Sequence, residues 1–231
     1  MKRLVPRPAK LLLHRIRRWA APEQFKWARE LSYWASRWEA EGGHLRNGHY
    51  QRLFVAMAGE ESQEFLRDKT VADFGCGPRG SLVWAEPARV RIGIDVLSSS
   101  YLRFGIARHP MCYVCSTEDC IPLPSEYVDI LFTLNAMDHV NNFATICAEC
   151  LRILAPGGSF IASFNLDHPA TPTEPQVLTE QQVYECLLKH LRVISYRIAA
   201  PGPPEDAYRH FFDQHIPPLS GPRYLWVRAV K

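Results

Sequence analysis

The feature that most constrains the fold of this chain is a short apolar segment that runs directly into a turn with three glycines. Residues 71–74 have the composition of a buried strand, and Gly75, Gly77 and Gly80 follow them. Glycine adopts the backbone conformations that a tight turn requires, and it lets a ligand approach the amide groups of the backbone. This arrangement is typical of the first unit of an α/β sheet, and a short helix is expected between Gly80 and Pro87.

Strand character returns in four further short segments, at 91–96, 111–115, 128–134 and 159–164. Helical or loop segments separate them, and this alternation predicts a parallel sheet with helices on both faces. No helix is expected between the last two predicted strands, at 192–198 and 224–230, so these should pair antiparallel. The sequence therefore predicts an α/β fold with a Rossmann-like, mostly parallel sheet of seven strands, helices on both faces and an antiparallel C-terminal strand pair.

The chain before the first strand is predicted to be helical. Trp27, Leu31, Trp34 and Trp38 recur at intervals of four, three and four, which places them on one face of a helix over 23–40. An aromatic stripe of this kind is more often core than a lid over a bound acceptor, and Trp34 is the candidate acceptor contact if it is a lid. Two further helices are expected, over 50–66 and 179–190.

Positive charge is concentrated at the start of the chain. The formal net charge is only +3, yet the first twenty residues hold seven Lys or Arg and no acid. An amphipathic segment of this kind suits peripheral contact with an anionic membrane, whereas a solvated chain end or an organellar transit peptide has the same composition. Residues 1–68 are therefore predicted to form a basic segment with a helical cap, and residues 69–231 the ligand-binding domain.

The rest of the composition excludes several classes of protein. No apolar run approaches the roughly 20 residues that span a bilayer, and no secretory leader pattern is present, so a cytoplasmic protein is expected. Beyond the N-terminal segment no basic stripe with interleaved aromatic residues follows, so nucleic acid is not an expected partner. The seven cysteines include two pairs spaced by three, at 112/115 and 147/150, but neither pair completes a tetrahedral site, so no metal is expected.

Two acidic residues mark the carboxyl ends of the first two predicted strands. Asp95 ends the second strand, where a carboxylate can accept both hydroxyls of a ribose. Asp73 lies just ahead of the glycines, where its charge opposes phosphate binding but suits an ammonium group. A turn of Pro156, Gly157 and Gly158 then ends a helix and leads into the fifth strand. Asp73, this turn and the terminal strand pair argue against a nicotinamide-dependent oxidoreductase, which uses the same kind of glycine turn.

In the order of these motifs the chain resembles the class I S-adenosylmethionine (SAM)-dependent methyltransferases, particularly those with a methyltransferase type 11 domain. The resemblance covers about residues 69–200. The motifs that carry it lie at residues 73–77 (DFGCG), 93–95 (GID), 117–124 (TEDCIPLP), 127–129 (YVD), 135–140 (NAMDHV) and 151–158 (LRILAPGG). Each motif is weak by itself, whereas the ordered set is specific.

The resemblance implies that SAM is the cofactor, and it assigns the residues that would bind it. Asp73 and the glycine turn would hold the methionine end, Asp95 the ribose, and the region of Thr117 and Glu118 the adenine. Ser116 stands where relatives often carry an acid, so Glu118 or main-chain atoms must meet the adenine amino group. The candidate cofactor-binding residues are Asp73, Gly75, Cys76, Gly77, Gly80, Asp95, Val96, Thr117, Glu118 and Asn135.

Methyl transfer from SAM depends chiefly on alignment of the acceptor, because the sulfonium already activates the methyl group. A general base is needed only for a protonated acceptor, and His139 is the candidate, with Asp138 second. As neighbours at the start of a helix they would point about 100° apart, which argues against a hydrogen-bonded dyad. Alternatively, His139 is a packing residue and Asp138 is an acid at the end of the helix. His168 and Glu174, after the fifth strand, are candidate acceptor contacts alongside Trp34, unless they are solvated loop residues.

The function expected from these residues is SAM-dependent methylation of a small-molecule acceptor. O-methylation of a sugar, a polysaccharide precursor or another metabolite is favoured. Two alternatives stay open: a nicotinamide-dependent oxidoreductase built on the same glycine turn, and a catalytically silent methyltransferase-like binding module. The intact glycine turn and Asp95 count against the second alternative.

Overall fold

The computed structural model of the protein describes residues 22–199, 208–212 and 221–231. The basic N-terminal segment, and with it the membrane and transit-peptide hypotheses, lies outside these residues. Most of the connection between the last two strands lies outside them as well. Within the described ranges, no helix combines the length and the apolar character that a membrane span requires.

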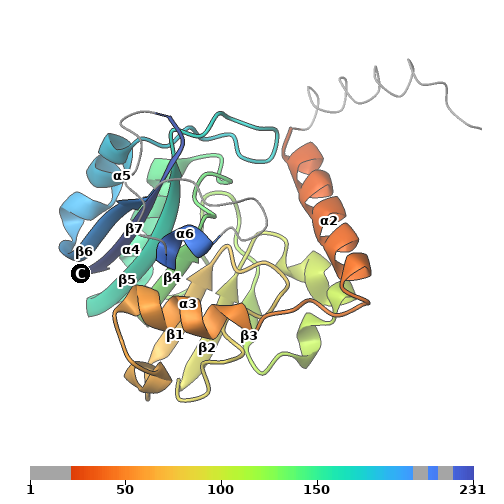
Figure 1. Ribbon diagram of the computed structural model, residues 1–231, viewed down its shortest axis with the longest axis horizontal. Helices are drawn as coiled ribbons and strands as arrows, with labels where there is room; N and C mark the ends of the chain where they lie inside the picture. The colour runs from red at the N-terminus through yellow and green to blue at the C-terminus, as the bar shows by residue number, and fades with distance from the viewer. Residues whose placement is uncertain (1–21, 200–207, 213–220) are drawn as a thin grey trace, which may run out of the picture.

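Seven strands of the described chain form one sheet, in the order β3-β2-β1-β4-β5-β7-β6 (Figure 1). They are β1 (Thr70–Phe74), β2 (Val90–Ile94), β3 (Cys112–Val114), β4 (Val128–Leu134), β5 (Leu154–Leu166), β6 (Arg192–Ala199) and β7 (Arg223–Val230). Strands β1 to β5 pair parallel with their neighbours, and β7 pairs antiparallel with both β5 and β6. This arrangement confirms the predicted fold. Because parallel strands end at the same edge of a sheet, Asp73 and Asp95 lie near each other there.

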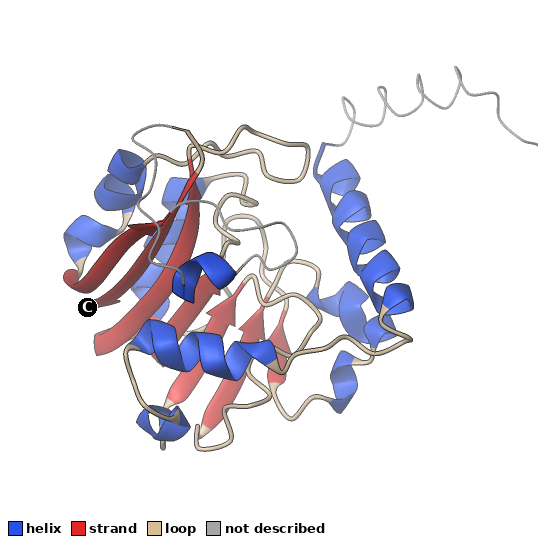
Figure 2. Ribbon diagram, in the orientation of Figure 1, coloured by secondary structure: helices blue, strands red, loops and turns tan. Residues whose placement is uncertain are grey.

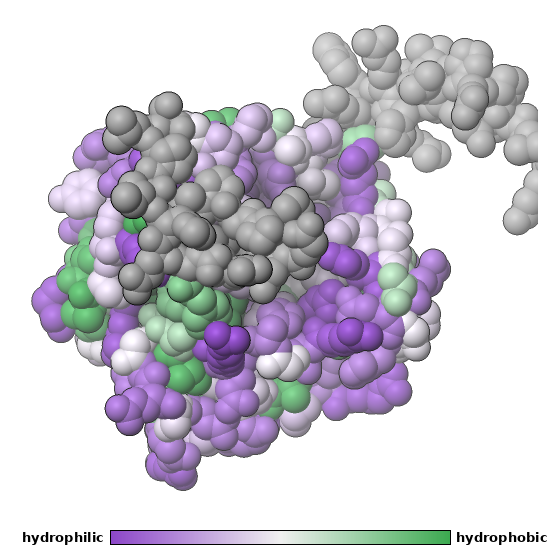
Figure 3. Space-filling view, in the orientation of Figure 1, coloured by the Kyte–Doolittle hydropathy of each residue, from purple (hydrophilic) through white to green (hydrophobic). Residues whose placement is uncertain are grey.

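Helices cover both faces of this sheet (Figure 2). The α-helices are α2 (Pro22–Ala40), α3 (His49–Ala58), α4 (Phe143–Ile153), α5 (Glu180–Cys186) and α6 (Arg209–Phe212), and the 3-10 helices are η1 (Gln63–Leu66), η2 (Ser98–Phe104), η3 (Ile106–Arg108) and η4 (Leu188–His190). Helices α3 and α6 lie on one face and α4 and α5 on the other, while α2 stands beside the sheet. The face seen in Figure 3 is mostly hydrophilic, with a hydrophobic patch over α6.

The structure corrects two of the predicted helices. A glycine explains one correction and a proline the other, because both residue types interrupt helices. The helix expected over 50–66 is divided into α3 and η1, because Gly59 adopts a left-handed φ of 66° and ends α3. Residues 81–84 form a turn rather than a short helix. Pro87 explains this, since it disfavours helical backbone just before it and leaves too few residues for a stable helix.

The helix start predicted at Asp138 and His139 is also wrong. Both residues lie in a turn, and α4 begins at Phe143. The Asn142 side chain accepts a hydrogen bond from the amide of Thr145 and so caps the helix. The conformation of a loop, and not helical geometry, therefore sets the directions in which the two candidate catalytic side chains point.

The pleat of the strands divides the core between the two faces of the sheet. In β4 the neighbours Leu131 and Phe132 are both fully buried, but Leu131 packs with α4 and α5 and Phe132 packs with α3. The ring of Phe54 on α3 stacks on that of Phe132, with 4.3 Å between the ring centroids. Helix α3 thus belongs to the packing of the sheet, whereas the domain boundary between residues 68 and 69 stays a prediction.

Phe54→Ala should lower the free energy of unfolding by about 3–5 kcal/mol, because it removes a fully buried ring between α3 and the sheet. Denaturant unfolding of the wild type and the variant measures this loss. Leu102→Ala on η2 is a suitable control, since Leu102 is 61% exposed and its replacement should change stability by less than about 0.5 kcal/mol. Equal effects of the two substitutions would contradict a structural role for α3.

Candidate functional site

A cavity of about 580 Å³ lies at the carboxyl ends of β1, β2 and β4. Its wall is built from the loops that follow these strands and from one side of α2, which closes it from the side. This edge is where open α/β sheets bind ligands. The sequence-predicted site residues in the wall are Trp34, Asp73, Gly75, Cys76, Gly77, Asp95, Val96, Thr117, Glu118, Asn135, His139 and Glu174.

The glycine turn after β1 brings three segments into close contact. Gly75 has a φ of 73°, and a Cβ atom there would lie 2.2 Å from the Cβ of Ala136 in the loop after β4. Gly77 has a φ of 56°, and a Cβ atom there would lie 2.8 Å from the ring of Trp34 on α2. Any side chain at either position would push away the loop or the helix that forms the opposite wall.

Asp73 contributes a buried carboxylate to the wall, and one oxygen of this carboxylate accepts no hydrogen bond. The residue is 3% exposed, and its Oδ2 accepts a hydrogen bond from the Ser81 hydroxyl. Its Oδ1 has no hydrogen-bond partner among the described residues. Burial raises the pKa of Asp73 to about 7, against the hydrogen bond from Ser81, and the charge of Asp95 raises it further. A hydrogen-bond acceptor of this kind suits a positively charged donor group and disfavours the binding of a phosphate.

Asp95 follows β2 and is held by the backbone of two turns. Its Oδ1 accepts a hydrogen bond from the amide of Leu97 at 2.8 Å, and its Oδ2 accepts one from the amide of Gly77 at 3.1 Å. Burial raises the pKa of Asp95, while these two hydrogen bonds oppose the shift. The Tyr101 hydroxyl also donates to this carboxylate, which lines the cavity and can still accept a hydrogen bond from a ribose hydroxyl.

Helix α2 is fastened over the cavity by Lys26. Its ammonium donates hydrogen bonds to Oε1 of Glu118 at 2.8 Å, to the carbonyl of His139 at 2.9 Å and to Oδ1 of Asn141 at 2.9 Å. The indole of Trp27 donates to the same Oε1 of Glu118. Oε2 of Glu118 accepts a further hydrogen bond from the amide of Asn141 at 3.3 Å. Both oxygens of Glu118 are therefore engaged, which leaves the main chain of the loop after β3 for contact with an adenine.

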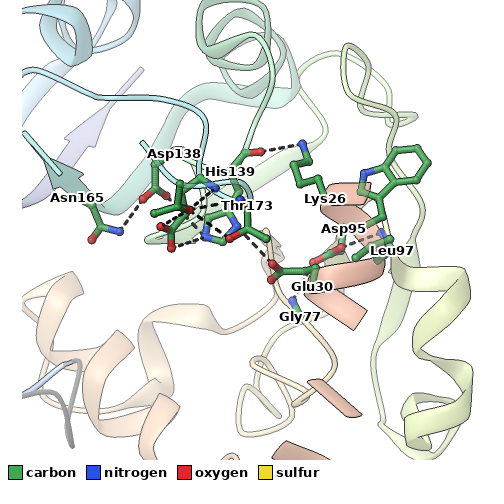
Figure 4. Close-up of polar contacts among 12 residues, drawn as sticks. Lys26, Glu30, Gly77, Asp95, Leu97, Asp138, His139, Asn165 and Thr173 are labelled. Carbon is green, nitrogen blue, oxygen red and sulfur yellow. Dashed lines mark hydrogen bonds and ion pairs between the residues drawn. The ribbon is translucent and has the colours of Figure 1, made fainter. Parts of the chain in front are cut away.

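His139 lies at the far end of the cavity among three carboxylates (Figure 4). Its Nδ1 is 3.7 Å from Oε2 of Glu30, and its Nε2 is 3.7 Å from Oε1 of Glu174 and 4.0 Å from Oδ1 of Asp138. These separations exceed hydrogen-bond lengths, so Asp138 and His139 form no hydrogen-bonded dyad. Asp138 accepts a hydrogen bond from Nδ2 of Asn165 at 2.7 Å. Burial raises the pKa of the Glu30 carboxyl and that of Asp138.

Three sequence-predicted residues lie outside the wall. Gly80 shapes the turn, because a Cβ atom there would lie 2.8 Å from the His109 ring. His168 packs edge-on against the ring of Tyr224, with 5.2 Å between the centroids. Asp138 reaches the site through its contact with His139. The roles assigned to all of these residues stay predictions.

Sequence reasoning missed the polar residues of α2. Lys26 and Glu30 both line the cavity, and they are spaced by four with Trp34 four residues further on. That spacing puts the three side chains on one side of the helix, next to the aromatic stripe. The stripe itself packs on Leu45, Tyr101 and other buried residues near η2, so α2 is both core and wall. The sequence signal that could have identified these residues is the pair of charged side chains, Lys26 and Glu30, next to an apolar stripe on the same helix.

Comparison with known proteins places this geometry in context. Residues 72–162 match a family model described as a methyltransferase domain. The chain is 28% identical over 168 residues to a relative from Mycolicibacterium smegmatis described as a probable SAM-dependent methyltransferase, and the match covers 68% of this chain and 58% of the relative. The chain thus spans less than two thirds of the length of that relative.

Solved structures share the fold at low identity. A SAM-dependent methyltransferase from Mesorhizobium loti superposes with a TM-score of 0.56 at 18% identity, over 76% of this chain and 96% of that one. Geranyl diphosphate C-methyltransferase from Streptomyces coelicolor, in complex with Mg²⁺, geranyl diphosphate and S-adenosyl-L-homocysteine, superposes with a TM-score of 0.57 at 16% identity, over 79% and 76%. These likenesses establish the fold.

Asp73→Asn should remove a pH-dependent part of the free energy of unfolding. Because the folded-state pKa of Asp73 is raised to about 7 from 3.8, its stabilising contribution is complete below about pH 4 and is lost as the pH rises to about 7. The variant should therefore gain on the wild type by roughly 1.4 kcal/mol per pH unit in this window. Urea denaturation without ligand measures the difference, with exposed Asp119→Asn as control. A difference that is constant with pH would contradict the raised pKa.

Proposed function

Because residues 72–162 match a methyltransferase domain and the chain is similar to a probable SAM-dependent methyltransferase, we propose that it is a class I SAM-dependent methyltransferase that transfers the methyl group of SAM to a hydroxyl oxygen of a small-molecule acceptor. A sugar, a polysaccharide precursor or another metabolite is the acceptor class. One observation carries the proposal: a single cavity joins Asp73 and Asp95 at one end to a polar cluster around His139 at the other. A cofactor and an acceptor can thus meet in one cavity.

The cofactor end fits SAM in its charge and in its hydrogen-bond acceptors. The unpaired Oδ1 of Asp73 suits the ammonium group of the methionine portion, and the carboxylate of Asp95, which lines the cavity, suits the ribose hydroxyls. Gly75 and Gly77 line the same cavity next to Asp73. The main chain around Ser116 is the contact proposed for the adenine, because both oxygens of Glu118 already accept hydrogen bonds.

The acceptor end must orient a hydroxyl group and remove its proton. SAM, when bound, supplies a methyl group on a positively charged sulfur, which keeps the electron pair of the broken S–CH₃ bond. Alignment of the acceptor with that methyl group can contribute roughly 7–11 kcal/mol. His139 and Asp138 are the residues proposed to assist loss of the proton, with Glu174 and Trp34 as acceptor contacts.

Transfer of label tests the proposed activity directly. The full chain is incubated with deuterium-labelled SAM and the small-molecule fraction of a cell extract, and the products are analysed by mass spectrometry. Labelled O-methyl products should form only with the active protein. Binding of a nicotinamide dinucleotide in place of SAM, measured by equilibrium dialysis, would overturn the proposal in favour of an oxidoreductase.

Asp95→Ala should weaken SAM binding by at least about tenfold. A carboxylate that accepts two hydroxyls makes charge-assisted hydrogen bonds of about 1.5–3 kcal/mol each, and about 1.4 kcal/mol corresponds to a factor of ten. Isothermal titration calorimetry measures the affinity, and a thermal melt checks that the variant is folded. Glu185→Ala on α5, which removes an exposed carboxylate, is the matched control. Unchanged affinity in a folded Asp95→Ala protein would remove the cofactor assignment.

His139→Ala should lower kcat by roughly 10²–10⁴-fold while SAM affinity stays nearly unchanged, because the residue acts on the acceptor and not on the cofactor. The acceptor found by label transfer serves as the substrate. His190→Ala on η4, which removes an exposed imidazole, should leave kcat unaltered. If kcat of His139→Ala stays within about threefold of the wild type, alignment alone is the mechanism and His139 is a packing residue.

A further inference from the structure

The cluster of Glu30, Asp138, His139 and Glu174 has the composition of a metal site. We propose that it binds a divalent cation through Oδ1 of Asp138, Nε2 of His139 and Oε1 of Glu174, and that this cation holds the hydroxyl oxygen of the acceptor. The second part rests on the proposed function, whereas cation binding itself does not. The expectation that no metal is bound rested on the paired cysteines, and these three residues belong to none of those pairs.

The geometry of the three donor atoms fits a single ion. They lie within 4.8 Å of one another, and Nε2 of His139 is 3.7 Å from the Glu174 oxygen and 4.0 Å from the Asp138 oxygen. Donors that share one cation at about 2.0–2.3 Å lie roughly 3–4.5 Å apart. Small rotations of the Glu174 side chain, which is 38% exposed, would complete the arrangement.

Asp138 provides an independent indication of a ligand. It is 3% exposed, and its Oδ1 finds no hydrogen-bond partner in the part of the chain that the structure describes. The hydrogen bond from Asn165 to Oδ2 orients the carboxylate so that Oδ1 is the oxygen nearer the His139 ring. A buried carboxylate oxygen without a donor is costly, so a cation bound there would relieve the cost.

Glu30 lies where a metal-bound histidine has a carboxylate beside its second ring nitrogen. Such histidines donate their second ring N–H to a carboxylate or carbonyl group, which orients the ring. Here Nδ1 of His139 lies 3.7 Å from Oε2 of Glu30, on the side of the ring away from the donor cluster. Lys26, one turn earlier on α2, donates to the main-chain carbonyl of His139 at 2.9 Å. Helix α2 therefore holds the backbone of this residue and places a carboxylate beside its ring.

The surrounding charges favour a cation in this place. Three carboxylates face one imidazole, and the nearby ammonium of Lys26 is engaged by Glu118 and Asn141. Arg29 also lines the cavity, but its guanidinium lies over the Phe25 ring. Two carboxylates with one imidazole suit Mn²⁺ better than Ca²⁺, which prefers oxygen donors throughout, or a structural zinc ion, which prefers thiolates and imidazoles.

The cation gives the cluster a defined chemical role. A hydroxyl oxygen bound to a divalent cation loses its proton more readily, because the cation stabilises the negative charge. The O–H bond breaks and its proton passes to water, the O–CH₃ bond forms, and the S–CH₃ bond breaks with its electron pair left on sulfur. In this arrangement His139 and Asp138 act through the cation. Acceptors with a second oxygen next to the hydroxyl group, such as a diol, can chelate it.

Titration with Mn²⁺ tests the site without any need for the acceptor. Electron paramagnetic resonance follows the signal of free Mn²⁺ as the full chain is added, and the wild type should take up one ion. Glu174→Gln and Asp138→Asn should each weaken uptake by at least about tenfold, since each removes a ligand charge. Glu86→Gln is the control, because Glu86 is exposed in the turn before β2, at the opposite edge of the sheet. Circular dichroism checks each fold, and Glu174→Gln serves alone if Asp138→Asn fails to fold.

The outcomes separate this inference from the proposed function. No uptake of Mn²⁺ by the wild type, or equal uptake by folded Glu174→Gln, would overturn the metal site. Label transfer that continues at the full rate in excess EDTA would overturn the role of the cation in holding the acceptor, while leaving the methyltransferase function intact. Uptake of Mn²⁺ that depends on Glu174, together with an absence of label transfer from SAM, would support the site and overturn the function.

Discussion

The buried ammonium of Lys26 is the interaction on which the closed cavity depends. An unpaired buried charge is strongly destabilising, but this one donates three hydrogen bonds to three acceptors and is 8% exposed. The acceptors belong to the loop after β3 and to the segment between β4 and α4. One side chain therefore joins α2 to two loops that are distant in sequence, and it brings Glu30 and Trp34 into the wall.

Several carboxylates lie in or beside this wall, and burial raises the pKa of three aspartates among them. Burial raises the pKa of Asp73 and that of Asp95, and the proximity of the two groups adds to the shift of Asp73. In Asp138 the same cause, burial, raises the pKa of the carboxyl. Buried like charges lower the stability of the free protein, and bound cationic or hydrogen-bonding ligands recover part of that loss. Binding and stability are thus opposed within one cavity, as is common at functional sites.

The sequence by itself determined the sheet, the direction of its strands and the end of the cavity proposed for the cofactor. Strand alternation, the glycine turn and a carboxylate at the end of a strand are local patterns, because hydrophobic periodicity and backbone dihedral preferences depend on neighbouring residues. Asp73 and Asp95 therefore stand at the edge where the pattern predicted them. The helix over 50–66 was predicted less well, since a single glycine with positive φ divides it.

Only the tertiary structure decided the acceptor end. Glu30, His139 and Glu174 come from α2, from a turn after β4 and from a loop after β5, and no local pattern relates them. The engagement of Glu118 by Lys26 joins residues 92 positions apart, so the resemblance that assigned Glu118 to the adenine could not reveal it. Contacts of this kind depend on how α2 packs against the loops of the sheet. That packing is a property of the assembled fold, because each segment alone leaves its charged groups in water.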